Sequence, residues 1–322
     1  MQGVDRDMDI RLIENNRIIW SVVALLMMAN FFGYRAAGLG IDFHGSFKAF
    51  FIIPAVYAVS LYYRYRRPDP WIARGVEGCA QAMSILLLGM MLTYPLATLD
   101  FPYRDSQLHA ADVWMGIDWQ AYLEFFNTRP ILGLLSKAAY CSMQLQYPLV
   151  ILALTASSRF LRLQQYILAI AIALLITLLI FTFVPAVGAY AYLGIPPEHY
   201  SNLGPIVLFE QMRHLEAMRT GSWSVISNME GLISFPSFHT ISAILFTWAI
   251  FPLRRLRWWT LGLNSALIVS TPIQGAHYFI DVVGGLLVAT IAIFGARLLA
   301  RDREVSAADQ RFVPRRQAGL PG

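Results

Sequence analysis

The chain has 322 residues, of which 57% are hydrophobic and only 14% are charged, and its mean hydropathy is +0.52. Soluble domains are about 45–50% apolar and about a quarter charged, so this composition excludes an ordinary soluble globular protein. The net charge of +5 does not indicate a nucleic-acid partner, because the basic residues follow the connections between apolar blocks in a pattern typical of membrane topology.

Eight apolar blocks follow one another along the chain. Each is near the ~20 residues that a helix needs to cross a bilayer. We therefore predict an all-α, polytopic integral membrane protein with about eight transmembrane helices. Residues 1–97 are expected to form N-terminal membrane anchor helices, 98–300 a membrane domain that carries the function, and 301–322 a disordered cytoplasmic tail. The predicted spans are residues 18–34, 47–63, 76–97, 131–154, 165–184, 238–253, 258–276 and 281–300.

The basic residues are distributed unequally between alternate connections. One set of connections, which includes both chain ends, holds 18 Lys and Arg residues, and the other set holds six. Cytoplasmic segments of membrane proteins carry this excess of positive charge. The asymmetry therefore predicts that both termini are cytoplasmic and that residues 35–46, 98–130, 185–237 and the turn near 275 face outward.

The outward segment 98–130 is acidic and aromatic. We expect it to form one helix lying in the membrane interface, with Trp114, Trp119 and Tyr122 at headgroup depth. We expect the carboxylates of this segment to lie on a solvent-exposed face. They belong to Asp105, Asp112 and Asp118.

The outward segment 185–237 is the longest. It opens with the turn-rich run PAVGAYAYLGIPP, and the later run FEQMRHLEAMRTG predicts a helix ended by Gly221. Cys79 and Cys141 both fall inside predicted spans, which indicates neither a disulfide framework nor a metal site. No metal and no cofactor is expected.

Two polar motifs stand at the outer ends of apolar spans. SFPSFHT contains His239, and TPIQGAHYFIDVVGG contains His277 and Asp281. His277 and Asp281 are four apart and would share one face of a helix. The carboxylate would fix the imidazole tautomer and leave the other nitrogen with its lone pair outward, as a nucleophilic histidine requires. The alternative is a structural pair that joins two helices.

Around His239 the sequence has the features of a helix start. Pro236 suits a first helical turn, and Ser234 or Ser237 can cap it. A helix N-terminus attracts anions, and His239 beside it could donate a proton. Alone, it could equally be an interfacial histidine bonded to a carbonyl. Together the motifs favour phosphoryl transfer, with one histidine attacking phosphorus and the other protonating the leaving oxygen.

At these residues the sequence resembles the type-2 phosphatidic acid phosphatase superfamily, which carries Pro-Ser-Gly-His and Ser-Arg-x5-His-x3-Asp motifs. Pro236, Ser237 and His239 match the first motif, with Phe238 in place of glycine. The residues that match the second are Ser270, His277 and Asp281, with Thr271 where arginine is expected. The family's upstream Lys-x6-Arg-Pro motif is absent in its usual form, since Tyr122 stands at the lysine position before Arg129-Pro130.

The runs FPSFHT, GAHYFIDVV and FVPAVGAY are similar to the inositolphosphotransferase branch, which includes inositol phosphorylceramide synthases. The resemblance covers roughly residues 95–300. It implies a six-helix catalytic core, a phosphohistidine intermediate and a lipid phosphate substrate, with an alcohol such as inositol as a possible acceptor. Arg213 and Arg219 are candidates to replace the missing basic groups, although a solvated helix face is an equal alternative for them. Tyr190 is a further candidate for the substrate pocket.

The function predicted from these features is a lipid phosphate phosphatase or phosphotransferase with its site on the extracytoplasmic side. Two alternatives remain open at this stage. One is a transporter or flippase that uses His277 and Asp281 as a proton relay, and such relays are typically placed at mid-membrane. The other is a catalytically inactive lipid-binding protein.

Overall fold

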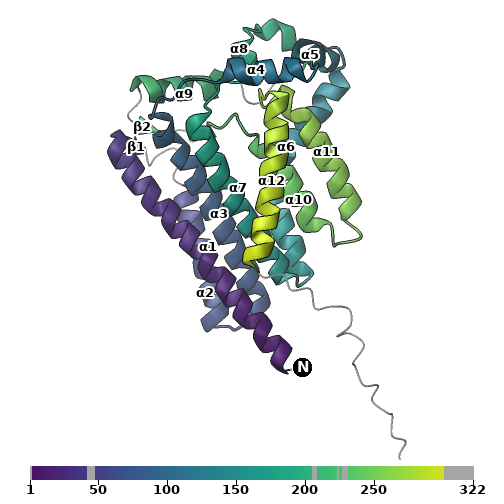
Figure 1. The fold of residues 1–322 in the computed structure, drawn as a ribbon. Coiled ribbons are helices and arrows are strands. Elements are labelled where there is room, and N and C mark those ends of the chain that lie inside the picture. The colour runs from purple at the N-terminus through teal and green to yellow at the C-terminus, as the bar shows by residue number, and fades with distance from the viewer. Residues whose placement is uncertain (1, 42–47, 205–208, 223–224, 227–230, 301–322) are drawn as a thin grey trace, which may run out of the picture.

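The computed structural model describes residues 2–41, 48–204, 209–222, 225–226 and 231–300, and most of them are helical (Figure 1). The predicted tail, 301–322, lies outside these residues. The long helices are α1 (Gln2–Ala37), α2 (Lys48–Tyr65), α3 (Pro70–Ala97), α6 (Pro130–Ala156), α7 (Phe160–Phe183), α10 (Phe238–Ile250), α11 (Arg257–Gln274) and α12 (Phe279–Leu299). The shorter ones are α4 (Asp105–Trp114), α5 (Trp119–Asn127), α8 (Ala189–Tyr192), the 3₁₀ turn η1 (Pro197–Tyr200) and α9 (Phe209–Thr220).

Each predicted span falls on one of the eight long helices, so the all-α prediction is confirmed. Among the residues that the structure describes, four helical segments are long and apolar enough to cross a membrane, namely Arg11–Ala37, Pro70–Ala97, Phe160–Phe183 and Phe279–Leu299. The exact number of spans stays a prediction. Among the others, α10 is apolar but has only 13 residues.

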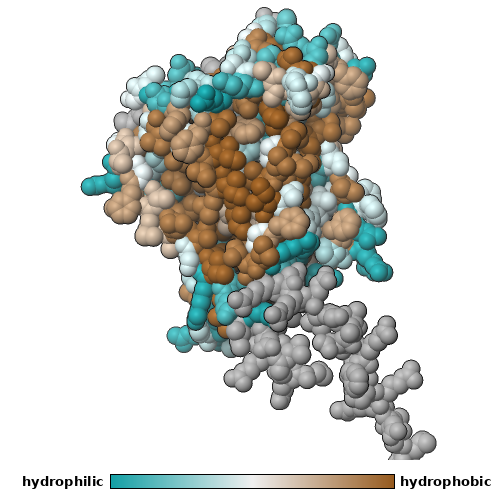
Figure 2. Space-filling model, in the orientation of Figure 1, coloured by the Kyte–Doolittle hydropathy of each residue, from teal (hydrophilic) through white to brown (hydrophobic). Residues whose placement is uncertain are grey.

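The surface supports a lipid environment. Figure 2 shows apolar side chains gathered in a band across the helices, with hydrophilic residues above and below it. Large apolar side chains point outward from several long helices, at a density that water would not favour. Examples, all more than half exposed, are Phe31, Phe32, Phe51, Ile131, Leu134, Leu145, Leu286 and Phe294.

The core of the bundle is built around α7, which packs against α1, α3, α6, α10 and α12. Small side chains such as Ala169 and Ala173 on α7 are fully buried and allow its neighbours to approach closely. Ile19 of α1 and Ile85 of α3 belong to the same hydrophobic cluster. The boundary between 1–97 and 98–300 stays a prediction, but the two parts share one hydrophobic core.

Local signals in the sequence explain several helix ends. The Asp69 carboxylate accepts hydrogen bonds from the backbone N–H groups of Trp71 and Ile72, and Pro70 occupies the first turn of α3. Gly221, with φ of +66°, follows the last residue of α9, as predicted. A short parallel pair, β1 (Gly40–Ile41) with β2 (Val225–Ile226), joins two of the segments that are predicted to face outward, and this pair was not predicted.

The segment 98–130 forms two helices rather than the single one expected. Gly116 adopts φ of +74° after α4, a conformation that ends a helix readily because glycine has no Cβ. Asp118 then starts α5, and its carboxylate accepts a hydrogen bond from the backbone N–H of Ala121 at 3.0 Å. Figure 1 shows α4, α5, α8 and α9 covering one end of the bundle, with the N-terminus at the other.

Candidate active site

The two histidine motifs meet beneath this helical cover. His239 lies in the first turn of α10, and His277 lies in the connection between α11 and α12. Their ring centroids are 6.4 Å apart. This spacing leaves the rings close enough to act on one small group between them. The folded chain therefore brings together the two residues that the sequence had placed 38 positions apart.

The pairing of His277 with Asp281 is observed, but its local structure differs from the one predicted. His277 precedes α12, whose N-cap is Tyr278, so the two residues do not share a helix face. Instead Asp281 reaches back from the first turn. Its Oδ2 lies 3.0 Å from His277 Nδ1 and 3.0 Å from the backbone N–H of Tyr278. The same oxygen accepts a bond from the hydroxyl of Ser234 at 3.3 Å.

This pairing determines which nitrogen of His277 can react. An ionised carboxylate can only accept hydrogen bonds, so His277 donates from Nδ1 and keeps the lone pair on Nε2. Both side chains are buried, with exposed fractions of 4% and 0%. The pairing thus orients the imidazole and leaves the Nε2 lone pair available, as a nucleophilic histidine requires. The role of His277 as the nucleophile stays a prediction.

His239 has a partner that the sequence did not reveal. The ring of Tyr140, from α6, stacks on it with centroids 4.0 Å apart and an angle of 15°. The Tyr140 hydroxyl lies 3.3 Å from His239 Nδ1. When Tyr140 donates this hydrogen bond, a neutral His239 carries its proton on Nε2. The two neutral histidines are then in opposite tautomers. A second proton on His239 would occupy Nδ1, which would donate to the Tyr140 oxygen instead.

The start of α10 is held against the start of α12. Ser237 is the N-cap, and its hydroxyl accepts a hydrogen bond from the backbone N–H of Thr240 at 3.3 Å. The backbone N–H of Ser237 donates to the carbonyl of Asp281 at 3.0 Å. Pro236 comes before the cap, so the prediction that it lies in the first turn was wrong. The helix α10 begins at Phe238, so its first backbone N–H groups, those of Phe238 and His239, lie close to the two histidine rings.

Two carboxylates of α4 shape the site, contrary to the prediction of a solvated face. Asp112 is fully buried and accepts hydrogen bonds from the backbone N–H groups of Phe279 at 2.9 Å and Ile280 at 2.8 Å. It therefore caps α12 from another helix. Burial raises the pKa of the Asp112 carboxyl, while these two N–H groups and nearby His109 lower it.

Asp105 is 3% exposed and ties the same helix to two other segments. It accepts hydrogen bonds from the backbone N–H groups of Val187 and Gly188 and from the Tyr278 hydroxyl, at 2.9 to 3.1 Å. The sequence did contain a signal for this, because Asp105, Leu108 and Asp112 recur at helical spacing and mark one face. Asp118, in contrast, is exposed as predicted.

The interfacial aromatic residues have different roles. Trp114 is 87% exposed and suits the predicted headgroup position, but Trp119 is only 2% exposed. Its indole Nε1 donates to the carbonyl of His277 at 3.0 Å, so the prediction for Trp119 was wrong. The Tyr122 hydroxyl donates to the carbonyl of Val269 in α11 at 2.7 Å. Trp119 and Tyr122 thus connect α5 by hydrogen bonds to the His277 turn and to α11, the helix before it.

The turn before His277 is conformationally strained. Ala276 adopts φ of +57°, which a residue with a Cβ rarely does. Its carbonyl accepts a hydrogen bond from the backbone N–H of Ala189, at the start of α8, at 2.8 Å. Tyr190, a predicted pocket residue, is buried and donates from its hydroxyl to the carbonyl of Ile273 at 2.9 Å. The observed contacts of Tyr190 therefore support the turn that presents His277.

The predicted phosphate ligands Arg213 and Arg219 both lie on α9. Arg219 is 2.6 Å from an Asp100 carboxylate oxygen and its guanidinium lies over the ring of Tyr103. Arg213 is exposed. These contacts link α9 to the segment after α3. The role of the two arginines at the phosphate stays a prediction.

The Asp112 cap can be tested by replacing Asp112 with asparagine. The amide keeps one oxygen acceptor, so one of the two buried N–H groups of α12 loses its partner, at a cost of about 1–3 kcal/mol. We expect a lower melting temperature of the purified protein. Asp118→Asn is the matched control, because asparagine caps a helix as well as aspartate and position 118 is exposed. An unchanged melting temperature for Asp112→Asn would contradict the proposed cap.

The arrangement has the parts of an acid–base and nucleophilic centre: an oriented imidazole, a second imidazole beside it, and the start of a helix. Within the described residues, no group of three or more His, Cys, Asp or Glu side chains is placed to hold a metal ion. The site lies where apolar helices end and polar loops begin.

Comparison with known proteins adds an independent finding. A search of curated proteins and a search of solved structures gave no match. A family model described as the PAP2 superfamily matches residues 106–295, more than half of the chain. The matched range contains His239, His277 and Asp281, the residues that the fold brings together. On this match, the chain belongs to the PAP2 superfamily.

Proposed function

We propose that this protein transfers a phosphoryl group from a lipid phosphate to water or to an alcohol through a phosphohistidine on His277. Membership of the PAP2 superfamily supports a phosphatase or phosphotransferase type of activity in a membrane. The observation that carries the mechanism is the pairing of His277 Nδ1 with Asp281, with the His239 ring 6.4 Å from the His277 ring.

In the first step, the lone pair of His277 Nε2 attacks phosphorus and forms the P–N bond. The P–O bond to the lipid breaks, and the leaving oxygen takes the Nε2 proton of His239 in its cationic form, which carries a proton on both nitrogens and donates from Nδ1 to the Tyr140 hydroxyl oxygen. Asp281 stabilises the positive charge that develops on the His277 ring. His239 is then a neutral imidazole with its lone pair on Nε2, and its Nδ1–H stays bonded to the Tyr140 hydroxyl.

In the second step, the oxygen of water or of an alcohol attacks the phosphohistidine. His239 removes the proton of the attacking O–H group, the new P–O bond forms, and the P–N bond breaks. His277 returns to its starting state. Hydrolysis and transfer to an alcohol such as inositol share the first step, so the proposal includes both. It also includes membership of the inositolphosphotransferase branch.

The start of α10 is our candidate for holding the phosphate oxygens. The first N–H groups of α12 are already bonded to Asp112, and the N–H of Tyr278 is bonded to Asp281. The first N–H groups of α10 lie beside His239, where the partial positive charge of a helix start favours an anion. Arg213 and Arg219 would add to this charge if a conformational change brought them to the site.

We also propose that the site faces away from the cytoplasm and that both termini are cytoplasmic. The unequal distribution of basic residues supports this orientation. His239 and His277 lie at the starts of α10 and α12. The start of α12 lies beneath α4 and α5, at the end of the bundle opposite the N-terminus (Figure 1). The substrate would then enter from the outer leaflet.

The test is an assay of the purified protein against a panel of lipid phosphates in mixed micelles, with and without inositol and other alcohols. Released phosphate reports hydrolysis, and a new phosphate ester reports transfer. We expect at least one lipid phosphate to be consumed by the unmodified protein. Consumption that persists equally in a preparation of His277→Ala would contradict the proposal, as would inactivity toward the entire panel.

A further inference from the structure

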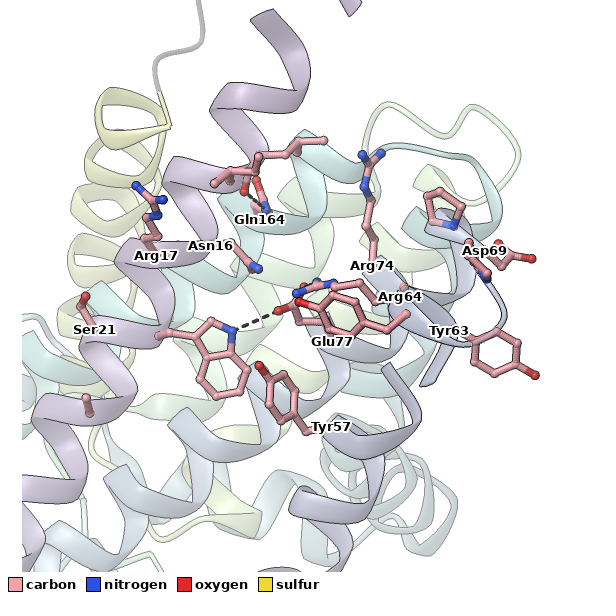
Figure 3. A pocket seen from close by; sticks show the side chains of 18 residues that line it. Asn16, Arg17, Ser21, Tyr57, Tyr63, Arg64, Asp69, Arg74, Glu77 and Gln164 are labelled. Atoms are coloured by element: carbon pink, nitrogen blue, oxygen red, sulfur yellow. Dashed lines mark hydrogen bonds and ion pairs between the residues drawn. The ribbon is translucent and has the colours of Figure 1, made fainter. Parts of the chain in front are cut away.

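A second polar site lies at the opposite end of the bundle from the histidines. A cavity of about 1140 Å³ opens there between α1, α2 and α3, with Gln164 contributed by α7 (Figure 3). Helices α1 and α2 both pack against α3. The rings of Trp20 and Tyr57 meet with centroids 4.7 Å apart and form part of the cavity wall. None of its lining residues belongs to the proposed active site.

The ionisable groups that line this cavity are more positive than negative. Within the described residues they are three arginines and two carboxylates: Arg17, Arg64, Arg74, Asp69 and Glu77. Figure 3 shows Arg17 and Arg74 on two sides of the cavity, with Glu77 and Arg64 between them.

Both carboxylates already accept hydrogen bonds from groups of the protein itself. Glu77 is 4% exposed and takes hydrogen bonds from Arg64 at 2.5 Å and from the Trp20 indole at 3.1 Å. Asp69 caps the backbone of α3. Arg17 makes no ion pair within the part of the chain that the structure describes, and its side chain is exposed. Arg17 therefore offers a guanidinium without an anionic partner among the described residues, and Arg74, whose guanidinium lies over the Phe160 ring, adds positive charge nearby.

We propose that this cavity binds the phosphate of an anionic phospholipid from the adjacent leaflet. Arg17 and Arg74 would hold the phosphate oxygens, because a guanidinium donates paired hydrogen bonds to such groups. The buried Glu77–Arg64 pair would keep Arg64 in place at the base of the site. The volume of about 1140 Å³ is slightly above the range of about 300–1,000 Å³ that is typical of small-ligand pockets, and it accommodates a headgroup with its glycerol.

The walls of the cavity favour a lipid over free phosphate. Ala24, Tyr57 and the ring of Trp20 line it together with the arginines, so polar and apolar surfaces meet in one space. The amphipathic rings of Trp and Tyr are typical of the boundary between headgroups and acyl chains. A phospholipid can contact both surfaces at once, whereas inorganic phosphate contacts only the first.

The experiment measures dissociation constants of the full chain by native mass spectrometry. The probes are short-chain phosphatidylglycerol, short-chain phosphatidylcholine, and glycerol phosphate, which has the headgroup chemistry without acyl chains. The variants are Arg17→Gln, the double variant Arg17→Gln with Arg74→Gln, and a matched control. The control replaces Arg66 and Arg67 with glutamine. Both arginines are exposed in the connection between α2 and α3, close to the cavity, but they do not line it.

We expect phosphatidylglycerol to bind the unmodified protein more tightly than the other two probes. Its affinity should fall at least about tenfold in the double variant, because charge-assisted hydrogen bonds are lost. Arg17→Gln should show part of this loss. Position 17 is exposed, so this variant should fold normally and keep its melting temperature. The control should bind as the unmodified protein does.

Three results would overturn the proposal. Equal losses in the cavity variants and the control would mean that the basic residues attract anionic lipid without a defined site. Equal affinity for phosphatidylcholine would remove the selection for negative charge. Equal affinity for glycerol phosphate would assign the cavity to a soluble phosphate compound. Each result leaves the proposed chemistry at His277 untouched, because the variants lie at the other end of the bundle.

Discussion

Replacing His277 with alanine should abolish the phosphorylated intermediate and lower turnover of every phosphate substrate by at least about 10⁴-fold. The reason is that no other observed group combines a free imidazole nitrogen with an orienting carboxylate at 3.0 Å. Rapid quenching after mixing with a radiolabelled lipid phosphate should trap label on the unmodified protein, and peptide mapping should place it on His277.

Two further variants accompany this test: a control at another histidine, and a variant that removes the negative charge beside His277. His199→Ala is the matched control, since His199 is exposed on η1, and it should keep full labelling. In Asp281→Asn the amide oxygen can take the place of Oδ2, which accepts all three observed hydrogen bonds. The amide nitrogen can occupy the position of Oδ1, which is buried without a partner among the described residues.

We therefore expect Asp281→Asn to fold and to lose roughly two to four orders of magnitude in turnover, because the negative charge beside the imidazole is gone. A label that appears on His239 and survives His277→Ala would show that the roles of the two histidines are reversed. Absence of label with every substrate that the unmodified protein consumes would contradict a covalent mechanism.

Replacing His239 with alanine should impair turnover in a way that depends on the leaving group. A lipid alkoxide is a poor leaving group and needs a proton as the P–O bond breaks, so its turnover should fall by about 10²–10⁴-fold. A nitrophenolate leaves as a stable anion, so its release should fall much less. In His277→Ala, both substrates should lose activity to the same extent. The measurement is kcat/KM for a lipid phosphate and for nitrophenyl phosphate in each variant.

Tyr140→Phe tests the support of this acid. The variant keeps the ring that stacks on His239 at 4.0 Å and removes only the hydroxyl 3.3 Å from Nδ1. Loss of that bond leaves the Nδ1–H of the protonated His239 ring without its acceptor, which makes the protonated ring less stable. We expect turnover of the lipid phosphate to fall and turnover of nitrophenyl phosphate to change little. Parallel losses for the two substrates, in either His239→Ala or Tyr140→Phe, would exclude His239 as the acid for the leaving oxygen.

Asp112 illustrates why part of the site could not be predicted. Its spacing from Asp105 places both carboxylates on one face of α4, but a polar face usually indicates solvent. Whether that face meets water or another helix depends on where α4 lies, and the hydrogen bonds from Phe279 and Ile280 cross 167 and 168 positions of sequence. Local pattern contains no information about such a partner.

Tyr140 and Trp119 are similar cases. Tyr140 lies inside an apolar stretch of α6, where an aromatic side chain has no distinctive signal, and it meets His239 only because α6 packs on α10. Trp119 looked like an interface anchor until α5 was placed against the His277 turn. For His277 itself, the four-residue spacing to Asp281 was a correct signal. That interpretation required His277 to lie within the helix, but α12 begins at Phe279, two residues later.

The sequence by itself determined the long apolar helices, the two histidine motifs and their resemblance to a phosphatase superfamily, because each depends on composition or on spacing within a few turns of chain. The tertiary structure alone decided that His239 and His277 lie close together, with Tyr140 bonded to the first and Asp281 to the second. It also decided that two carboxylates of α4 accept hydrogen bonds from the start of α12 and from the segment before α8. These features depend on contacts between residues far apart in the sequence. Such contacts form only when α7 and its neighbours pack into one core.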